Sequence, residues 1–314
     1  MIIVTGAAGF IGSVLVRALN DAGHEDLVLV DDFSNEERNK NLTGKKFQIK
    51  VDLWEFPVWL QKNEKKLTFI FHLGGKTDTT IFDPVVFEKY NVGPSKTIWN
   101  FSTENNIPFV YASSAATYGG GEQGYADAHE LIHLLRPLNH YGQSKQDFDL
   151  WALNQKTSPP FWAGLKFFNA YGPNEYHKSR MASVAFHSFN QIQREEKVKL
   201  FRHGEQERDF VYVKDIAAVC LFLMKNRPAS GIYNAGTGKA RSFKSLAEAV
   251  FAALKREPKI EYIDIPPDIR EKYQSFTEAK VDKLRAAGYD KRFTSLEDGV
   301  KDYIQNHLLP KKYL

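Results

Sequence analysis

The sequence has little cysteine and no long apolar run. Cys220 is the single cysteine, so no disulfide forms within the chain, which is typical of a protein in a reducing compartment. It lies in the apolar helical stretch AAVCLFLM, which predicts a buried thiol. The apolar runs fall short of the about 20 residues that cross a membrane, and the opening MIIVTGAAGF lacks the features of a secretory signal. We therefore expect a cytoplasmic protein that does not enter a membrane.

The chain also lacks a large excess of one charge. It has 42 Lys and Arg residues against 38 Asp and Glu residues, a net charge of +4, and the two signs are interspersed. Proteins that bind nucleic acid usually concentrate their basic residues on one face, so we expect no nucleic-acid partner. A chain of 314 residues that is 43% hydrophobic has room for one large domain or two closely packed ones.

The stretch HELIHLLRPLNHYGQSK contains two competing catalytic patterns. The first is H-E-x-x-H, in which His129 and His133 would share a helix face and bind zinc. The extended form of this motif fails, because Arg136 and Asn139 stand where a glycine and a third histidine belong. Pro137 also ends any helix that begins here. We predict no metal site and place both histidines on a surface loop or short helix.

The start of the chain has the pattern of a dinucleotide-binding strand–helix–strand unit. Ile2–Thr5 is a short apolar run typical of a buried parallel strand, apolar residues then recur at helical spacing from Phe10, and Leu27–Val30 is a second strand. Three glycines separate the first strand from the helix: Gly6, Gly9 and Gly12. Small residues at this point let a pyrophosphate approach the helix N-terminus, and Asp31 after the second strand is placed to bind the adenosine ribose.

The residues after the second strand leave the choice of nicotinamide cofactor open. Asp31 and Asp32 suit the free 2′-hydroxyl of NAD, because a carboxylate accepts its hydrogen bond. Arg38 and Lys40 follow in the same loop and suit the 2′-phosphate of NADP, or are ordinary solvated charges.

Strands alternate with helices through the first half of the chain. The further strands that we predict are Phe47–Val51, Leu67–His72, Pro108–Ser113 and Phe161–Phe168. One predicted helix runs from Pro84 to Phe101 and another contains Tyr141. This alternation predicts an α/β fold with a Rossmann-type doubly wound parallel sheet. Ligands bind at the carboxyl ends of such strands, where four segments meet: Gly6–Gly12, Gly74–Thr80, Ser113–Thr117 and Asn169–Pro173.

The second pattern, Y-x-x-x-K, places Tyr141 and Lys145 on one helix face, because residues four apart are neighbours on a helix. A free phenol has a pKa of about 10. An adjacent ammonium and an oxidised nicotinamide both favour the phenolate, so we expect Tyr141 to take a proton from a substrate hydroxyl. Ser114, which follows a predicted strand, would hold that hydroxyl. This pattern is the one that we expect to carry the chemistry.

Several motifs in order resemble a known superfamily. GAAGFIG, SSAATYG and YGQSK, followed by FFNAYGP, RDFVYVKDIA and GIYNAGTG, resemble the extended short-chain dehydrogenases/reductases over nearly the whole chain. The resemblance implies a nucleotide-sugar epimerase, dehydratase or reductase. A 4,6-dehydratase would carry an acidic pair where this chain has Ala115 and Ala116. A non-catalytic dinucleotide sensor would have lost Tyr141 or Lys145, and both are present.

A narrower resemblance rests on HKSRMASVAFH, KLFRHGEQERDFVYV and YQSFTEAKVDKLRAAGYDK, which are similar to the ADP-glyceromanno-heptose 6-epimerase family. It implies inversion at C-6 of an ADP-heptose for lipopolysaccharide core, a tightly held NADP, a homo-oligomer, and Lys178 as a second acid/base beside Tyr141. The expected cofactor residues are Gly6, Gly9, Phe10, Ile11, Gly12, Asp31, Asp32, Arg38, Asp52, Leu53, Leu73, Gly74, Gly75, Asn91, Tyr141, Lys145, Ala170 and Lys178. The substrate residues that it implies are Asn169, Ser179, Arg180, His187, Phe201, Arg202, His203, Gly204, Arg208 and Tyr273.

Two acid/base groups suit an epimerisation through a ketone. The cofactor is fixed, so the sugar must present its other face, and a proton acceptor on each side serves both orientations. Tyr141 and Lys178 are of the right type, although a loop lysine that binds phosphate or water is the alternative for Lys178. The guanidinium of Arg208 suits a diphosphate. His187 is either a substrate ligand or a packed histidine, and Asn91 either stiffens the catalytic helix or caps a turn.

The chain departs from the pattern of that family at three places. LGGKTDTT stands where a glutamate-containing segment is expected, so Lys76 and Asp78 add charge beside the cofactor. Arg180 replaces a serine, and Lys166 replaces an arginine. These departures leave a UDP-hexose 4-epimerase as the alternative function, since that enzyme would share the glycines, Ser114 and the Y-x-x-x-K pair.

The substrate-binding part is predicted to be interleaved with the cofactor-binding part. We expect residues 1–169 and about 208–240 to form the Rossmann domain, and about 170–207 with 241–314 to form a smaller α/β substrate domain. Residues 242–255 and 295–308 have the apolar spacing of amphipathic helices.

Overall fold

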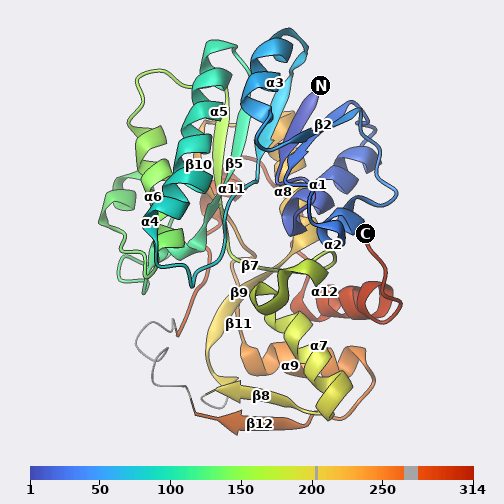
Figure 1. Cartoon of the computed structure of the whole chain (residues 1–314). Coiled ribbons are helices and arrows are strands. Elements are labelled where there is room, and N and C mark those ends of the chain that lie inside the picture. The colour runs from blue at the N-terminus through green and yellow to red at the C-terminus, as the bar shows by residue number, and fades with distance from the viewer. Residues whose placement is uncertain (202–203, 265–274) are drawn as a thin grey trace.

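The computed structural model describes residues 1–201, 204–264 and 275–314, and its centre is a seven-stranded sheet (Figure 1). The strands lie in the order β10-β6-β5-β4-β1-β2-β3, and each neighbouring pair is parallel. Their bounds are β1 (Ile2–Thr5), β2 (Leu27–Asp31), β3 (Ile49–Asp52), β4 (Phe69–His72), β5 (Phe109–Ser114), β6 (Trp162–Phe167) and β10 (Gly231–Ala235). The predicted doubly wound parallel sheet is confirmed.

Two predicted strands begin two residues later in the structure than in the sequence pattern. β3 begins at Ile49 instead of Phe47, and β4 begins at Phe69 instead of Leu67. The N–H of Leu67 donates to the carbonyl of Glu64 and so closes the turn that precedes β4. A residue whose N–H closes a turn cannot donate that N–H to the neighbouring strand. The apolar pattern alone does not show which residues form such turn hydrogen bonds.

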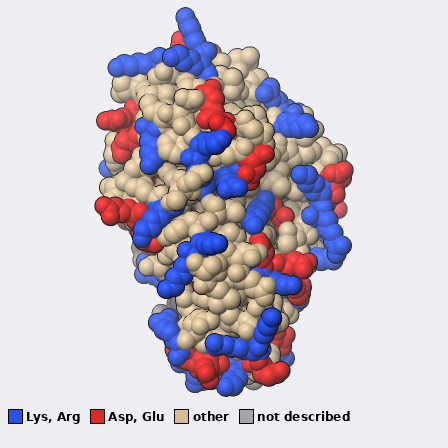
Figure 2. All heavy atoms as spheres, turned by 90° about the vertical axis from the view of Figure 1, so that its right-hand side faces the viewer, with Lys and Arg blue, Asp and Glu red and all other residues tan. Residues whose placement is uncertain are grey.

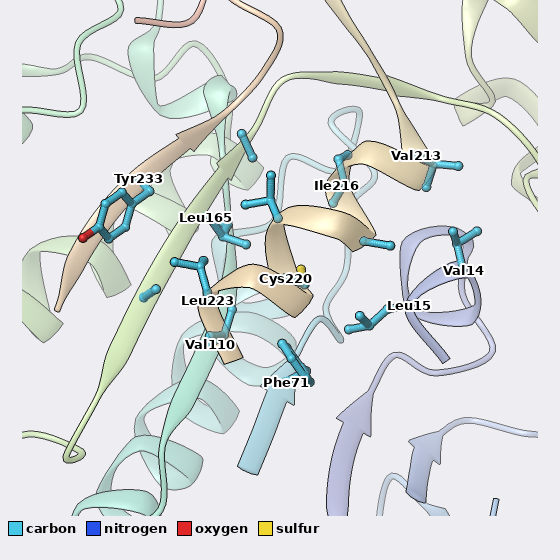
Figure 3. Packing of buried hydrophobic residues seen from close by; sticks show 14 of the residues in the cluster. Val14, Leu15, Phe71, Val110, Leu165, Val213, Ile216, Cys220, Leu223 and Tyr233 are labelled. Atoms are coloured by element: carbon cyan, nitrogen blue, oxygen red, sulfur yellow. The ribbon is translucent and has the colours of Figure 1, made fainter. Parts of the chain in front are cut away.

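Helices cover both faces of this sheet. On one face, α1 (Phe10–Asp21) and α8 (Val213–Asn226) pack together, and Cys220 is fully buried there with Leu15 and Leu223 (Figure 3). On the other face lie α3 (Phe56–Asn63), α5 (Gly93–Glu104) and α6 (His140–Leu153). Because side chains alternate along a strand, Val4 enters the first apolar cluster and Ile3 the second.

The predicted helix after Pro84 forms in three consecutive segments. α4 (Pro84–Phe87) runs into a π-helical turn, η3 (Glu88–Val92), and then into α5. The remaining short helices are α2 (Glu36–Asn39), η1 (Lys40–Leu42), η2 (Glu64–Lys66), η4 (Ala115–Tyr118), η5 (His129–Leu134), η6 (Tyr176–Met181) and α11 (Asp282–Ala286).

A smaller part lies at the carboxyl ends of the sheet strands (Figure 1). Its strands form two small sheets: β7 (Asn169–Tyr171), β9 (Glu207–Tyr212) and β11 (Ala240–Ser242), and β8 (Val198–Phe201) with β12 (Ile260–Ile263). Its helices are α7 (Val184–Glu195), α9 (Phe243–Ala253), and α12 (Leu296–Tyr303) continued by the π-helical η8 (Ile304–Leu308). These helices share an apolar cluster of their own. Residues of this part therefore reach over the strand ends of the main sheet.

Surface charge and helix composition bear on possible nucleic-acid and membrane partners. On the face shown in Figure 2, lysine and arginine alternate with aspartate and glutamate, and no broad patch of one sign covers it. In the described part of the chain, no helix combines the length and the apolar character that a membrane span requires.

Candidate active site

The glycine-rich loop lies against the loop that follows β4. Gly6 has a φ of +67°, and a Cβ there would lie 2.8 Å from the Cα of Gly74. A Cβ on Gly12 would lie 2.1 Å from the carbonyl oxygen of Gly6. α1 begins at Phe10, and its N-cap Gly9 provides no side-chain acceptor. The free N–H groups of this first turn are thus available to an anion, as at other helix N-termini.

Two adjoining cavities flank this loop. The first, which we call the loop cavity, has a volume of about 330 Å³ and is lined by the glycine loop, Leu73–Asp78 and Lys178. The second, the lateral cavity, has a volume of about 340 Å³. Both are lined by Gly6, Arg38, Gly74, Gly75 and Lys76. A larger hollow of about 1320 Å³ lies at the amino ends of β1 and β4, beside Met1, and none of the candidate residues lines it.

The lateral cavity fits the adenosine end of a dinucleotide. Leu53, Trp54 and Ile98 offer apolar surface to a flat base, and Asp31 and Asp32 line the same space. Of the predicted pair after β3, Leu53 lines the cavity. Asp52 does not line it, and its carboxylate accepts the N–H of Trp54 at 2.9 Å. The residues of the two cavities together fit a dinucleotide with its diphosphate on the helix N-terminus.

The carboxylate of Asp31 is already engaged by the protein. It accepts the N–H of Ala8 at 2.9 Å and that of Asp32 at 2.8 Å, and it forms an ion pair with Arg38. Burial raises the pKa of Asp31, while Arg38 and the backbone bonds oppose that shift. Lys40 instead pairs with Glu37 and lines neither cavity. Of the two basic residues, Arg38 therefore faces the candidate cofactor site.

Tyr141 and Ser114 meet where β5 ends and α6 begins. The side chain of Asn139 caps α6 by accepting the N–H of Gly142 at 2.8 Å, which fixes the first turn that carries Tyr141. Ser114 is the last residue of β5, and its hydroxyl lies close to the Tyr141 side chain. Burial raises the pKa of Tyr141, and the interaction with Ser114 opposes this. The two side chains that we expect at one substrate hydroxyl therefore lie together.

Lys145 lies one turn farther along α6 and is buried. Its ammonium donates to the carbonyl oxygen of Ala112 at 2.7 Å, and a Cβ on Gly75 would lie 3.6 Å from its Nζ. Burial lowers the pKa of Lys145 to about 8, and the Asp149 carboxylate opposes that shift. The pKa of Tyr141 is raised, so the protein without its cofactor does not favour the phenolate. The phenolate was predicted for a site that also holds an oxidised nicotinamide.

Lys178 lies on η6 in the smaller part and lines the loop cavity. Its ammonium is 5.1 Å from the centre of the Phe10 ring. Burial lowers the pKa of Lys178, and the charge of Glu175 opposes this. Glu175 is fully buried and accepts both the N–H and the hydroxyl of Ser183 at 2.6 Å, which ties η6 to the start of α7.

Two of the departures from the family pattern contact each other. The guanidinium of Arg180 lies 2.8 Å from the carboxylate of Asp78 and 2.5 Å from the hydroxyl of Thr80. The hydrogen bond from Thr80 and that from Arg180 lower the pKa of Asp78 to about 2. Next to this pair, Ser179 is exposed with a φ of +48°, and the Nε2 of His187 lies 3.3 Å from the carbonyl oxygen of Arg180. The pair links the loop after β4 to the smaller part.

Asn91 connects the same loop to the catalytic helix. Its side chain accepts the N–H of Lys76 at 2.7 Å and donates to the carbonyl of Lys76 at 3.0 Å. It also donates to the hydroxyl of Ser144 on α6 at 2.9 Å. These bonds favour the first of the two interpretations, in which Asn91 stiffens the catalytic helix. They also occupy its side-chain amide within the protein.

The remaining predicted residues lie at several places. Asn169 and Ala170 begin β7, directly after the main sheet. Phe201, Gly204 and Arg208 lie near the start of α9, where the Arg208 guanidinium is 5.6 Å from the Phe243 ring and donates to the Glu207 carbonyl. They do not line the two cavities. Arg202, His203 and Tyr273 lie outside the described residues.

The histidines of the competing motif have other contacts. η5 is a 3₁₀ helix, in which residues four apart do not share a face. His129 accepts the N–H of Ile232 at 3.0 Å, and His133 is exposed. In the described ranges, no group of three or more His, Cys, Asp or Glu side chains is arranged to hold a metal ion.

Sequence reasoning missed a buried polar group behind Ser114. Asp149 and Lys166 form an ion pair in which both side chains are fully buried. The available signal was spacing, because Tyr141, Lys145 and Asp149 follow one another at intervals of four on α6.

Comparison with known proteins identifies close likenesses. The NAD dependent epimerase/dehydratase family pattern matches residues 2–236. The chain is 46% identical to the ADP-L-glycero-D-manno-heptose-6-epimerase of Fusobacterium nucleatum and 45% identical to that of Nitratidesulfovibrio vulgaris, over 98% of each chain in both cases. It is 28% identical to the Helicobacter pylori enzyme of the same name, whose crystal structure matches with a TM-score of 0.82 over 97% of this chain and 95% of that one.

Proposed function

Because the chain belongs to the NAD dependent epimerase/dehydratase family, we propose that it converts ADP-D-glycero-D-manno-heptose to ADP-L-glycero-D-manno-heptose. Like its curated relatives, the chain is an isomerase that acts on a nucleotide sugar. The observation that carries the proposal is the contact of Ser114 with Tyr141 where β5 ends, with Lys145 one turn farther along α6 beside Gly75, which lines the same loop cavity as Lys178. The product would serve the synthesis of lipopolysaccharide core.

The side chains of the site divide the proton chemistry. A bound nicotinamide would supply the hydride acceptor and donor for C-6. Ser114 would hold the substrate hydroxyl, and Tyr141 would take its proton on oxidation. Lys178, with a pKa lowered by burial, would give a proton to the same oxygen on re-reduction, when the ketone presents its opposite face. Lys145, whose pKa of about 8 keeps it largely protonated at neutral pH, supplies positive charge near the phenol.

We assign NADP as the cofactor, with NAD as the alternative. Arg38 lines both cavities, and a guanidinium matches phosphate oxygens in geometry. Its ion pair with Asp31 offsets the carboxylate charge, which would otherwise repel a 2′-phosphate. Mass spectrometry of the nucleotide released from denatured protein identifies the cofactor. Arg38→Ala is expected to weaken NADP binding more than NAD binding, and equal losses would contradict the assignment.

The remaining proposals concern the whole molecule. We assign residues 1–169 with about 208–240 to cofactor binding, and about 170–207 with 241–314 to the substrate. Asn169, Ser179, His187, Phe201 and Arg208 would contribute to sugar and diphosphate binding, with Asn169 and Arg208 at the boundaries between the two parts. We also propose that the protein is cytoplasmic. We further propose that it forms a homo-oligomer, whose molar mass light scattering would measure.

The test of function is conversion followed by proton NMR. With ADP-D-glycero-β-D-manno-heptose, the wild type is expected to invert C-6. Tyr141→Phe and Lys178→Met are each expected to lower kcat on the order of 10²-fold or more, because each removes an acid/base group. Tyr233→Phe and Lys45→Met are matched controls, since these side chains donate to the backbone carbonyls of Ala229 and Asn41 and line neither cavity.

The outcomes separate the alternatives. Loss in Tyr141→Phe alone would leave Lys178 as a binding residue. If the heptose is untouched and UDP-galactose is epimerised, the chain is a UDP-hexose 4-epimerase, and the Arg180–Asp78 pair marks a changed sugar site.

A further inference from the structure

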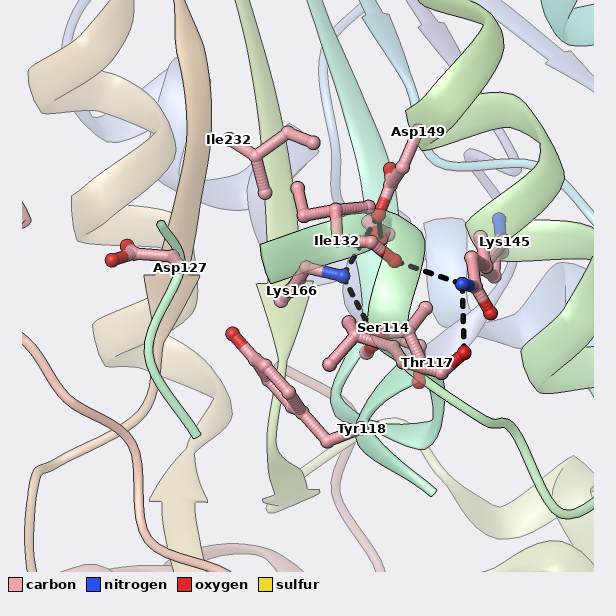
Figure 4. A network of polar contacts seen from close by, with 12 residues as sticks. Ser114, Thr117, Tyr118, Asp127, Ile132, Lys145, Asp149, Lys166 and Ile232 are labelled. Carbon is pink, nitrogen blue, oxygen red and sulfur yellow. Dashed lines mark hydrogen bonds and ion pairs between the residues drawn. The ribbon is translucent and has the colours of Figure 1, made fainter. Parts of the chain in front are cut away.

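An ion pair lies behind the candidate site, inside the protein. The ammonium of Lys166 on β6 is 2.9 Å from a carboxylate oxygen of Asp149 on α6, and both side chains are 0% exposed. Figure 4 shows the pair between the β5–β6 region and the helix that carries Lys145. Neither residue has a part in the proton chemistry proposed above.

Stability alone does not account for such a pair. Removing two charges from water costs several kcal/mol for each ion, and replacing a buried pair by packed apolar residues is often neutral or stabilising. The other contacts of the two side chains determine what the pair holds in place.

Both charges are fully engaged by their surroundings. Asp149 also accepts the hydroxyl of Tyr111 at 2.9 Å and that of Ser113 at 2.7 Å. Lys166 also donates to the hydroxyl of Thr117 at 2.5 Å, and its ammonium lies 5.0 Å from the centre of the Tyr118 ring. A fully satisfied buried network of this kind specifies one arrangement of the elements that it joins.

The elements that it joins carry the catalytic side chains. On one side, Thr117 donates its hydroxyl to the carbonyl of Ser114 at 2.8 Å, and Ser113 directly precedes Ser114. On the other side, Asp149 follows Lys145 by four residues, as Lys145 follows Tyr141, so the three lie along one face of α6. The network thus bridges the serine and the helix face that bears the phenol and the ammonium.

Asp149 also acts on Lys145 through charge. The titratable groups near Lys145 are Tyr141 and Asp149 on its own helix, His72 on β4 and, behind Asp149, Lys166 on β6. Burial lowers the pKa of His72 to about 3, so it is uncharged at neutral pH. The Asp149 carboxylate is the group that opposes the effect of burial on the pKa of Lys145.

We propose that Asp149 and Lys166 are positioning residues that hold Ser114 and the Tyr141–Lys145 face in register, and that Asp149 keeps Lys145 in its charged form. The kinetic part of this inference rests on the proposed epimerase function, whereas the charge of Lys145 is measurable without any substrate.

The kinetic test compares Asp149→Asn with Thr117→Val across pH. Asp149→Asn removes the carboxylate charge, so the pKa of Lys145 falls and the alkaline limb of kcat moves to lower pH. Thr117→Val cuts the link to Ser114 and leaves that charge, so kcat falls and the limb stays in place. In both variants kcat is expected to fall about ten-fold, or about 1.4 kcal/mol in barrier, with KM within about two-fold because the pair does not touch substrate.

Asp215→Asn is the matched control, because Asp215 is a partly buried carboxylate that accepts the N–H and hydroxyl of Thr294 in a region away from both cavities. It is expected to leave kcat and the pH profile unchanged. An unshifted alkaline limb in Asp149→Asn, or an equal fall of kcat in Asp215→Asn, overturns the proposal.

NMR titration of isotope-labelled lysine side chains separates this inference from the function. The Lys145 signal, assigned by its loss in Lys145→Arg, is expected to titrate at lower pH in Asp149→Asn than in the wild type and in Asp215→Asn. This readout needs no sugar. Failure of the heptose assay with a shifted Lys145 pKa would reject the substrate alone, and an unshifted pKa would reject the role of Asp149.

Discussion

Two ion pairs of nearly equal length border the candidate site and differ in their access to water. Lys166 and Asp149 are 2.9 Å apart and fully buried, whereas Arg180 and Asp78 are 2.8 Å apart with side chains that are 66% and 25% exposed. Attraction between charges depends on the surrounding dielectric as well as on distance. Burial, and not distance, therefore determines which of the two pairs has the stronger attraction between its charges.

The two ion pairs also connect different structural elements. The buried pair joins β6 to α6 within the main sheet and its covering helix. The exposed pair joins the loop after β4 to η6 of the smaller part, beside Lys178. The first lies inside the main part of the molecule, and the second lies across the boundary between the main part and the smaller part.

The largest expected contrast is in stability when one cation is removed. Lys166→Met leaves the Asp149 carboxylate buried without its cation, and we expect a loss of about 3–5 kcal/mol in the free energy of unfolding. Arg180→Met leaves Asp78 in contact with water, and we expect a loss of about 0–1 kcal/mol. Denaturant unfolding of the two variants measures both values. Equal losses in the two variants would contradict the expectation that burial sets the contribution of each pair.

A smaller and more specific contrast is the coupling energy within each pair. In double-mutant cycles, the combination of Lys166→Met with Asp149→Leu is expected to cost less than the sum of its parts by about 2–3 kcal/mol, since the unpaired charge is then absent. Stability will still not return fully, because the hydroxyls of Tyr111 and Ser113 lose their acceptor. The corresponding cycle for Arg180→Met and Asp78→Ala should give less than about 1 kcal/mol. A larger coupling for the exposed pair would reverse the ranking.

The smallest expected effect is the response of the exposed pair to acid. The pKa of Asp78 is lowered to about 2, first by Thr80 and then by Arg180. A carboxyl whose pKa is lower in the folded state contributes stability above its unfolded pKa of about 3.9 and loses it as pH falls through the folded value. The stability difference between wild type and Arg180→Met is thus expected to shrink between about pH 5 and pH 2. Added salt at neutral pH should also reduce this stability difference. A difference that stays constant with both pH and salt would contradict a contribution of the Arg180–Asp78 ion pair to stability.

The sequence predicted those parts of the molecule that depend on near neighbours. Apolar periodicity and the three glycines located β1, α1 and β2, and the spacing of four residues placed Tyr141 and Lys145 on one helix. Arg180 and Asp78 were each recognised as unusual residues, yet they are 102 positions apart, and nothing local indicates that they meet. The raised pKa of Tyr141 was missed for a similar reason, since burial is set by the packing of distant segments.

The π-helical turn that holds Asn91 makes the site sensitive to chain length as well as to side-chain chemistry. A π turn accommodates one residue more than an α turn. Deleting one residue between Glu88 and Val92 would return the segment to an α-helix, in which the side chains of this turn point in other directions relative to α5. The Asn91 amide would then leave Lys76 and Ser144, which it now joins. At this position a single codon lost or gained acts on the active site although no catalytic residue is altered.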